Sequence, residues 1–178
     1  MIISKIQNNK TNKSVQISFK AIEDIRNFKK IDEFVYRGGQ PTKEQLLDLK
    51  KEGVSSIINF RTLFVPFIDF VEAEECQKLG IKNISIPLIS KNGPSEKDVT
   101  DFFEITDKTR AEKSKIFIHC AWGKDRTGIM SALYKVKYGL DNITNCAKEM
   151  LEMGHDNTRF PDLIPTFEKI AKKLIQNS

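Results

Sequence analysis

The sequence predicts an α/β fold: a central, mostly parallel sheet flanked by helices, with a helical C-terminal third. Strand-like apolar runs alternate along the chain with helical segments of about 10 to 15 residues, the pattern of parallel sheets with crossover helices. After the strand-like run at 115–119, only helical periodicity follows. The 178 residues, of which 39% are hydrophobic and 30% charged, have the size and balance of one globular domain.

The N-terminal residues differ in composition from the rest. Residues 1–20 are rich in Asn, Lys and Ser, so we expect a flexible tail there, with one strand at Val15–Phe19. A single domain should then occupy 21–178, because no linker, low-complexity stretch or repeat interrupts it. Its first expected strand is Phe34–Arg37, which ends at a Gly-Gly pair.

Signals for the start and end of helices separate the expected elements in the first half of this domain. Thr42 can cap a helix that ends at Gly53, since glycine suits the left-handed position after a helix. A β-rich run follows at Val54–Phe60. A second helix is expected over Pro66–Leu79, because a glycine follows it, and then a strand at Ile81–Pro87.

The second half begins with a helix signal and a buried strand. Ser95 and Asp98 form a capping-box pattern, which predicts the start of a helix. Lys115–His119 is apolar enough to be a strand buried on both faces of a parallel sheet. In such sheets ligands bind beyond the carboxyl ends of the strands, where Arg61 and Cys120 would lie.

The segment after this buried strand carries the most specific signal. Residues 119–128 read HCAWGKDRTG, with Cys120 and Arg126 six positions apart around a loop that enters a helix. Backbone N–H groups and the positive end of the helix dipole would surround the cysteine and favour its thiolate. The planar guanidinium can bind two phosphate oxygens. This layout indicates in-line attack on phosphorus and a phosphocysteine that water hydrolyses, without a metal ion or cofactor.

Neighbouring residues complete the expected site. Thr127 can donate its hydroxyl to the cysteine sulfur, and Gly123 permits a tight backbone curl. We expect these residues to bind the substrate: Ala121, Trp122, Gly123, Lys124 and Arg61. The alternatives are a surface ion pair for Arg61, a solvated Lys124, and a Trp122 that only covers loop backbone.

The pattern HCxxGxxRT at 119–127 resembles the signature of the cysteine-based protein tyrosine phosphatase superfamily. Upstream segments look like the early strands of its compact, dual-specificity members: Tyr36–Pro41, Ile57–Arg61 and Ile84–Pro87. The resemblance extends over residues 30–175 and is closest to bacterial and to atypical plant and fungal members. It implies that Cys120 is the nucleophile, that Arg126 binds phosphate and that Thr127 assists the leaving sulfur.

The resemblance also bears on two supporting roles. It implies that His119 orients the cysteine loop by hydrogen bonding. Family members usually carry an aspartate in the loop after the third strand to protonate the leaving oxygen, and here Ser90 stands at that place. Asp125, inside the cysteine loop, is one substitute, and Asp98 or Asp101 is another. The capping box already explains Asp98, and the absence of any dedicated acid is the remaining alternative.

The implied function is a hydrolase acting on phosphorylated protein or on inositol phosphates and phosphoinositides. The Gly-Lys-Asp-Arg run is similar to loops in phosphatases of both kinds, and Lys124 adds a second cation for substrates with several phosphates. A phosphatase specific for inositol pyrophosphates is a narrower alternative. Two other classes stay open: a pseudophosphatase module that binds phosphate without turnover, and a thiol-transfer enzyme of the rhodanese or arsenate-reductase kind.

Composition excludes several other classes. The net charge of +5 favours anionic partners, but the lysines are dispersed and no nucleic-acid motif occurs. The three cysteines lack CxxC spacing, and Cys76 and Cys146 are expected to be buried small hydrophobes in a reducing compartment. No secretory signal or membrane-spanning run is present, which favours a cytoplasmic location. The histidines lack metal-ligand spacing, and His155 is interpreted as a helix-end residue.

Overall fold

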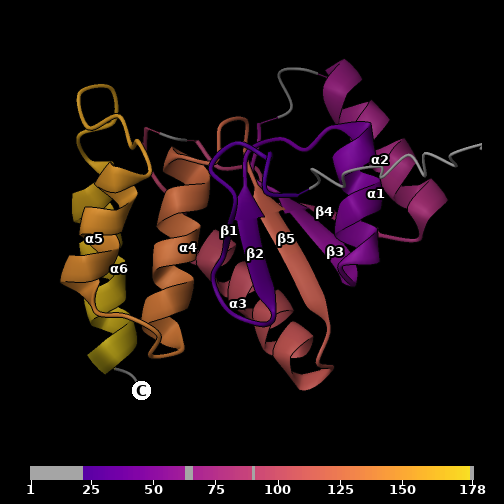
Figure 1. Cartoon of the computed structure of the whole chain (residues 1–178). Coiled ribbons are helices and arrows are strands. Elements are labelled where there is room, and N and C mark those ends of the chain that lie inside the picture. The colour runs from indigo at the N-terminus through magenta and orange to yellow at the C-terminus, as the bar shows by residue number, and fades with distance from the viewer. Residues whose placement is uncertain (1–21, 63–65, 90, 177–178) are drawn as a thin grey trace, which may run out of the picture.

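The computed structural model describes residues 22–62, 66–89 and 91–176 (Figure 1). The expected tail at 1–20, with its strand at Val15–Phe19, lies outside the described residues, and so does Ser90. Within the described ranges, no helix combines the length and the apolar character that crossing a bilayer requires.

A five-stranded sheet with the strand order β1-β2-β5-β3-β4 forms the centre of the fold. The strands are β1 (Lys29–Lys30), β2 (Val35–Gly38), β3 (Val54–Asn59), β4 (Lys82–Ser85) and β5 (Lys115–His119). All neighbouring pairs are parallel except β1 and β2. The predicted α/β class with a mostly parallel sheet is therefore confirmed. The antiparallel β1 was not predicted, because two exposed lysines carry no local strand signal.

Six helices flank the sheet in the described residues. They are α1 (Lys43–Lys51), α2 (Pro66–Leu79), α3 (Glu96–Ala111), α4 (Asp125–Lys137), α5 (Ile143–Glu152) and α6 (Leu163–Gln176). The predicted bounds of α2 and β5 are confirmed, whereas β4 is shorter than the expected Ile81–Pro87 and β3 ends one residue early. The C-terminal third is helical, as expected.

Local capping explains where two of these helices begin. The Thr42 side chain accepts a hydrogen bond from the Gln45 backbone at the start of α1, and the Gln45 side chain accepts one from the Thr42 backbone. Ser95 and Asp98 form the same reciprocal pair at the start of α3, so the predicted capping box is confirmed. After α1, Gly53 has a φ of +90°, as the predicted helix end requires.

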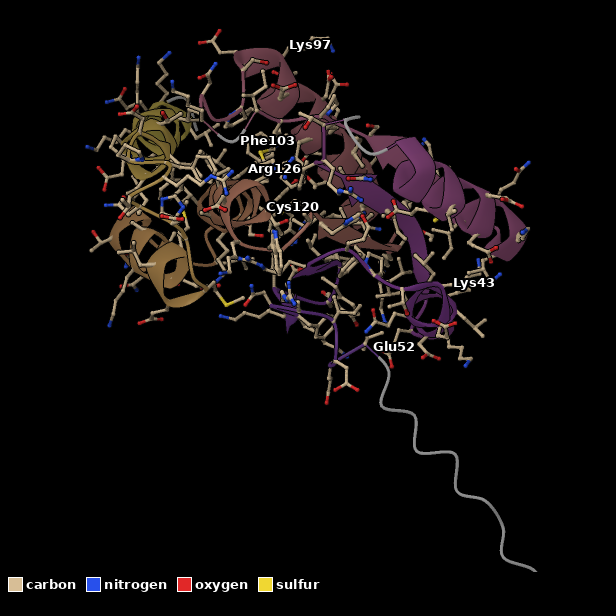
Figure 2. All side chains as sticks on the ribbon, turned by 90° about the horizontal axis from the view of Figure 1, so that it is seen from above. Lys43, Glu52, Lys97, Phe103, Cys120 and Arg126 are labelled. Atoms are coloured by element: carbon tan, nitrogen blue, oxygen red, sulfur yellow. The ribbon has the colours of Figure 1, made fainter. Side chains whose placement is uncertain are left out.

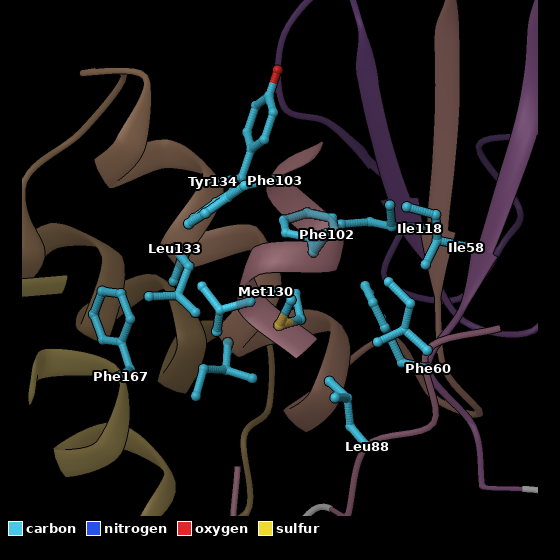
Figure 3. Close-up of a cluster of buried hydrophobic side chains, with 14 of the residues drawn as sticks. Ile58, Phe60, Leu88, Phe102, Phe103, Ile118, Met130, Leu133, Tyr134 and Phe167 are labelled. Atoms are coloured by element: carbon cyan, nitrogen blue, oxygen red, sulfur yellow. The ribbon is translucent and has the colours of Figure 1, made fainter. Parts of the chain in front are cut away.

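Two apolar cores lie on opposite faces of the sheet. Alternate residues of β5 belong to different cores: Ile116 and Ile118 to the larger one, Phe117 to the smaller. The smaller core packs under α1 and α2, and the larger lies between the sheet and the helices α3 to α6 (Figures 1 and 3). Every residue of α4 from Thr127 to Val136 is buried, because α5 and α6 cover its outer side. The loop from β5 into α4 is therefore held between two buried elements.

Candidate active site

Cys120 directly follows β5 at the carboxyl end of the sheet and is 3% exposed. The loop that it begins leads into α4 at Asp125. Lys124 is the N-cap residue of α4, and its side chain makes no capping hydrogen bond. The first N–H groups of the helix therefore have no acceptor from the Lys124 side chain. Cys120 and Arg126, which belongs to α4, are labelled close to each other in the view from above (Figure 2). The loop thus has the strand-to-helix geometry of an anion site.

The backbone at the end of β2 packs directly against the cysteine loop. Gly123 has a φ of +71°, and a Cβ atom there would lie 2.6 Å from the Gly38 carbonyl carbon and 2.7 Å from the Gly39 nitrogen. A Cβ at Gly39 would in turn lie 3.2 Å from the Ala121 carbonyl oxygen. The Gln40 N–H donates to that same oxygen over 3.2 Å. The curl expected at Gly123 is present, and it needs a glycine for space as well as for conformation.

Arg37 ties β2 to the same loop from within the core. Its side chain is almost fully buried, and its Nη2 donates to the Gly123 carbonyl oxygen. Burial lowers the pKa of Arg37 to about 10, against the charges of Glu149 and Cys120, which raise it. Its Nε atom has no hydrogen-bond partner among the described residues. Arg37 was not predicted to have a role, although a charged residue within a buried strand is a signal for one.

Arg126 and Thr127 lie in the first turn of α4. Arg126 is half-buried, and its Nη1 donates to the Phe60 carbonyl oxygen over 3.4 Å, just beyond the carboxyl end of β3. Thr127 is fully buried, and its hydroxyl lies 3.5 Å from the Gly38 carbonyl oxygen that accepts from it. The expected hydrogen bond from Thr127 to the sulfur stays a prediction.

His119, the last residue of β5, connects the loop to α2. Its Nε2 lies 3.2 Å from Glu72 Oε1, and its Nδ1 lies 3.4 Å from the Cys120 carbonyl oxygen. Three amide side chains also donate to the Glu72 carboxylate: Gln40, Asn59 and Asn83. Burial by itself would raise the pKa of Glu72, but His119 and the amide donors hold it below its ordinary value. Glu72 was missed by sequence reasoning because nothing in α2 marks its distant partners.

Arg61 belongs to this same polar network. It is 7% exposed, its Nη1 donates to Gln40 Oε1 over 2.6 Å, and its backbone N–H donates to Asn59 Oδ1 over 2.8 Å. Because Gln40 also donates to Glu72, the Arg61 guanidinium is joined to the network that orients His119. Arg61 is therefore buried rather than on the surface, and its binding of substrate stays a prediction.

Trp122 forms the outer edge of the loop and is 54% exposed. The Arg26 guanidinium lies 3.9 Å from the centre of its indole ring, a cation–π contact. Asn27 Nδ2 donates to the Trp122 carbonyl oxygen over 2.9 Å. The segment before β1 therefore fixes this edge while much of the indole stays open to solvent.

The segment after α5 contacts the two remaining loop residues. Asp125 Oδ1 lies 2.7 Å from His155 Nδ1 and accepts from the Asp156 N–H over 3.1 Å. A Cβ atom at Gly154 would lie 3.1 Å from Lys124 Cε. His155 does follow the end of α5, as expected, but it is buried and bonded to the loop. Sequence reasoning missed this contact because the two residues are 30 positions apart.

The other candidate acids have separate partners on α3. Asp98 Oδ2 accepts from the Ser95 N–H over 2.8 Å and from the Ser95 hydroxyl over 2.6 Å. Asp101 forms an ion pair with Lys97 at 2.6 Å. None of these described bonds involves the cysteine loop, whereas Asp125 lies within it.

The two other cysteines are buried and free, as expected. Burial raises the pKa of the Cys76 thiol to about 12 and that of Cys146 to about 11. Neither thiol is suited to act as a nucleophile near neutral pH. Within the described part of the chain, no group of three or more His, Cys, Asp or Glu side chains is arranged to hold a metal ion.

Several solved structures share this fold. A candidate phosphatase from Shewanella putrefaciens is 21% identical with a TM-score of 0.69, over 90% of this chain and 98% of that one. TpbA from P. aeruginosa is 13% identical with a TM-score of 0.63, over 84% and 91%. PTPMT1 in complex with PI(5)P is 16% identical with a TM-score of 0.68, over 84% and 97%. No curated protein sequence matches the chain.

The sheet, the loop and these neighbours define the fold of the cysteine-based protein tyrosine phosphatases. A family model described as "DSP-PTPase phosphatase fused to NAD+ Kinase" matches residues 5–162, so the chain belongs to this family of dual-specificity-type phosphatases. The resemblance inferred from the loop is confirmed at this level.

Proposed function

We propose that the domain at 21–178 is a metal-independent phosphatase that hydrolyses phosphomonoesters through a phosphocysteine, with Cys120 as nucleophile. One observation carries the proposal. The buried Cys120 lies at the carboxyl end of β5, in a loop that curls on the backbone of Gly38 and Gly39 before it enters α4. This geometry directs backbone N–H groups and the positive end of a helix toward a phosphate beside the thiol.

The proposed reaction has two displacement steps. In the first, the Cys120 thiolate attacks phosphorus, the S–P bond forms, and the ester P–O bond breaks as Asp125 gives a proton to the leaving oxygen. Arg126 binds two of the phosphate oxygens in both steps. In the second step water attacks phosphorus, Asp125 takes up its proton, and the sulfur leaves with help from the Thr127 hydroxyl. The protein groups alone neutralise the developing charge.

The proposed substrates are phosphorylated proteins or inositol-based phosphates in the cytoplasm. Lys124 supplies a second cation beside Arg126, which suits substrates that carry several phosphates. Among proteins with the same fold, TpbA binds pTyr and PTPMT1 binds PI(5)P. The free buried thiols of Cys76 and Cys146 are consistent with a reducing compartment.

Hydrolysis of an aryl phosphate in the presence of a chelator tests the proposal. We expect turnover that is lost in Cys120→Ser, and a phosphorylated thiol that can be trapped by rapid acid quenching. Cys76→Ala is the matched control, because burial raises the pKa of that thiol to about 12, and it should retain activity. Full activity of Cys120→Ser would refute the mechanism. Binding of inorganic phosphate by the wild type without turnover of any phosphopeptide or inositol phosphate would indicate a pseudophosphatase instead.

A further inference from the structure

We propose that His155 is a positioning residue for the Asp125 carboxyl group, so that the segment after α5 is part of the active site. The proposal rests on the function proposed above, in which Asp125 is the general acid. It extends the site to a residue that the local loop pattern does not include.

The contact between the two side chains is short and enclosed. The His155 side chain is 0% exposed and the Asp125 side chain 17% exposed, with 2.7 Å between Nδ1 and Oδ1. The Asp156 N–H donates to the same Oδ1 atom over 3.1 Å. Among the described residues, the other carboxyl oxygen, Oδ2, has no hydrogen-bond partner. Oδ1 is therefore held by two donors, and Oδ2 is the oxygen available for proton transfer.

The environment of His155 determines where its proton lies. Its Nε2 atom is buried and has no hydrogen-bond partner among the described residues. A proton on Nε2 would leave a buried N–H group without an acceptor, whereas a proton on Nδ1 meets Asp125 Oδ1 directly. Of the two tautomers, the one with its proton on Nδ1 is thus favoured. It holds Oδ1 as an acceptor and leaves Oδ2 as the oxygen that can carry the transferable proton.

The backbone around His155 is itself fixed against the loop. Its N–H donates to the Met150 carbonyl oxygen over 3.0 Å at the end of α5. Gly154 has a φ of +86°, and a Cβ atom there would lie 3.1 Å from Lys124 Cε and 3.3 Å from Lys124 Nζ. The same three-residue segment therefore contacts both loop residues that precede Arg126. A histidine that served packing alone would not need the short bond to Asp125.

The orientation of the Asp125 carboxyl group should matter most for substrates with poor leaving groups. As the S–P bond forms and the P–O bond breaks, a proton passes from Asp125 Oδ2 to the leaving oxygen, and water returns a proton to Oδ2 in the second step. Without His155 the carboxyl group gains rotational freedom, and the acid is correctly oriented for less of the time. A good leaving group departs without a proton, so kcat/KM, which reports the first step, should not respond to this loss for such a substrate.

The test compares two variants of His155 on aryl phosphates with good and with poor leaving groups. His155→Leu removes the donor and keeps an apolar side chain of moderate size. His155→Asn keeps an N–H donor close to the Nδ1 position. We expect His155→Leu to lower kcat/KM about 10-fold to 100-fold for the poor leaving group and less than about 3-fold for the good one. His155→Asn should recover most of that loss.

Asp125→Asn separates this inference from the proposed function. Asp125→Asn should give the same leaving-group dependence, and adding His155→Leu to it should have no further effect, because both changes remove the same step. Equal losses on both substrates in His155→Leu, or additive losses in the double variant, would show a merely structural role. If Asp125→Asn depends on the leaving group and His155→Leu does not, only the positioning role is refuted. If neither does, the acid assignment falls too. Loss of activity in Cys120→Ser tests the proposed nucleophile independently of both.

Discussion

Gly123 offers the sharpest test of how the cysteine loop is held. A Cβ atom at this position would lie 2.6 Å from the Gly38 carbonyl carbon, and its neighbours there are backbone atoms that cannot rotate away. To reach the 3.4 Å at which ordinary contact begins, the loop or β2 must shift by about 0.8 Å. Gly123→Ala should therefore displace the loop and also strain its backbone.

The expected cost follows from the contacts that this shift breaks. An alanine at positive φ costs roughly 1–2 kcal/mol. The hydrogen bonds from Arg37 to the Gly123 carbonyl oxygen and from Gln40 to the Ala121 carbonyl oxygen add about 1 kcal/mol each. Gly123→Ala should thus destabilise the protein by about 3–4 kcal/mol and lower Tm by about 10 °C. A displacement near 1 Å should lower kcat/KM about 100-fold.

Gly139→Ala is the matched control. Gly139 has a φ of +64°, similar to that of Gly123, but nothing lies within 4 Å of its Cβ position. It should lose only the conformational part, roughly 1–2 kcal/mol, and keep its activity. Thermal unfolding by circular dichroism and hydrolysis of an aryl phosphate measure the two effects. Equal stability and equal kcat/KM in both variants would refute the argument that loop contact with Gly38 and Gly39 sets the site geometry.

Three further predictions concern residues around the loop. Arg37→Met should lower kcat/KM about 10-fold to 100-fold, because it removes a charged donor to the Gly123 carbonyl oxygen. The control, Lys30→Met at an exposed position, should leave kcat/KM unchanged, and equal steady-state kinetics for the two variants would contradict this role of Arg37. Lys124→Ala should weaken hydrolysis of inositol polyphosphates about 10-fold and that of a phosphotyrosine peptide much less; equal losses would contradict the two-cation argument. Because the pKa of Glu72 is lower in the folded state than the ordinary 4.5, its contribution to stability is present above that pH and is lost as pH falls through the folded pKa. Thermal melts from about pH 6 to about pH 3 should therefore show an acid-dependent loss of stability that is smaller in Glu72→Gln, and an identical pH dependence would refute this role.

The elements with strong local signals were predicted well. The bounds of α2 and β5 matched because a glycine follows the helix and a continuous apolar run forms the strand. The capping box at Ser95 matched because it depends on side chains three positions apart. By contrast, β1 is defined only by its pairing with β2. A two-residue strand of exposed lysines has no periodicity that a sequence could reveal.

The residues of the site also fall into those with a local signal and those without one. Cys120 and Arg126 were recognisable because their roles depend on spacing within one loop. Arg37, Glu72 and His155 were not, because each contacts the loop or its strand across a long stretch of sequence, and each looks ordinary among its own neighbours.

The alternation of strands and helices, the capped helix starts and the spacing of the thiol and the guanidinium around one loop can all be predicted from the sequence. These features depend on residues within a few positions of one another. The groups that hold that loop come from distant parts of the chain and are visible only in the folded protein: the backbone of Gly38 and Gly39 against Gly123, and His155 beside Asp125. Such contacts arise when parallel strands bring their carboxyl ends to one edge of the sheet and helices pack around it, and no local pattern encodes them.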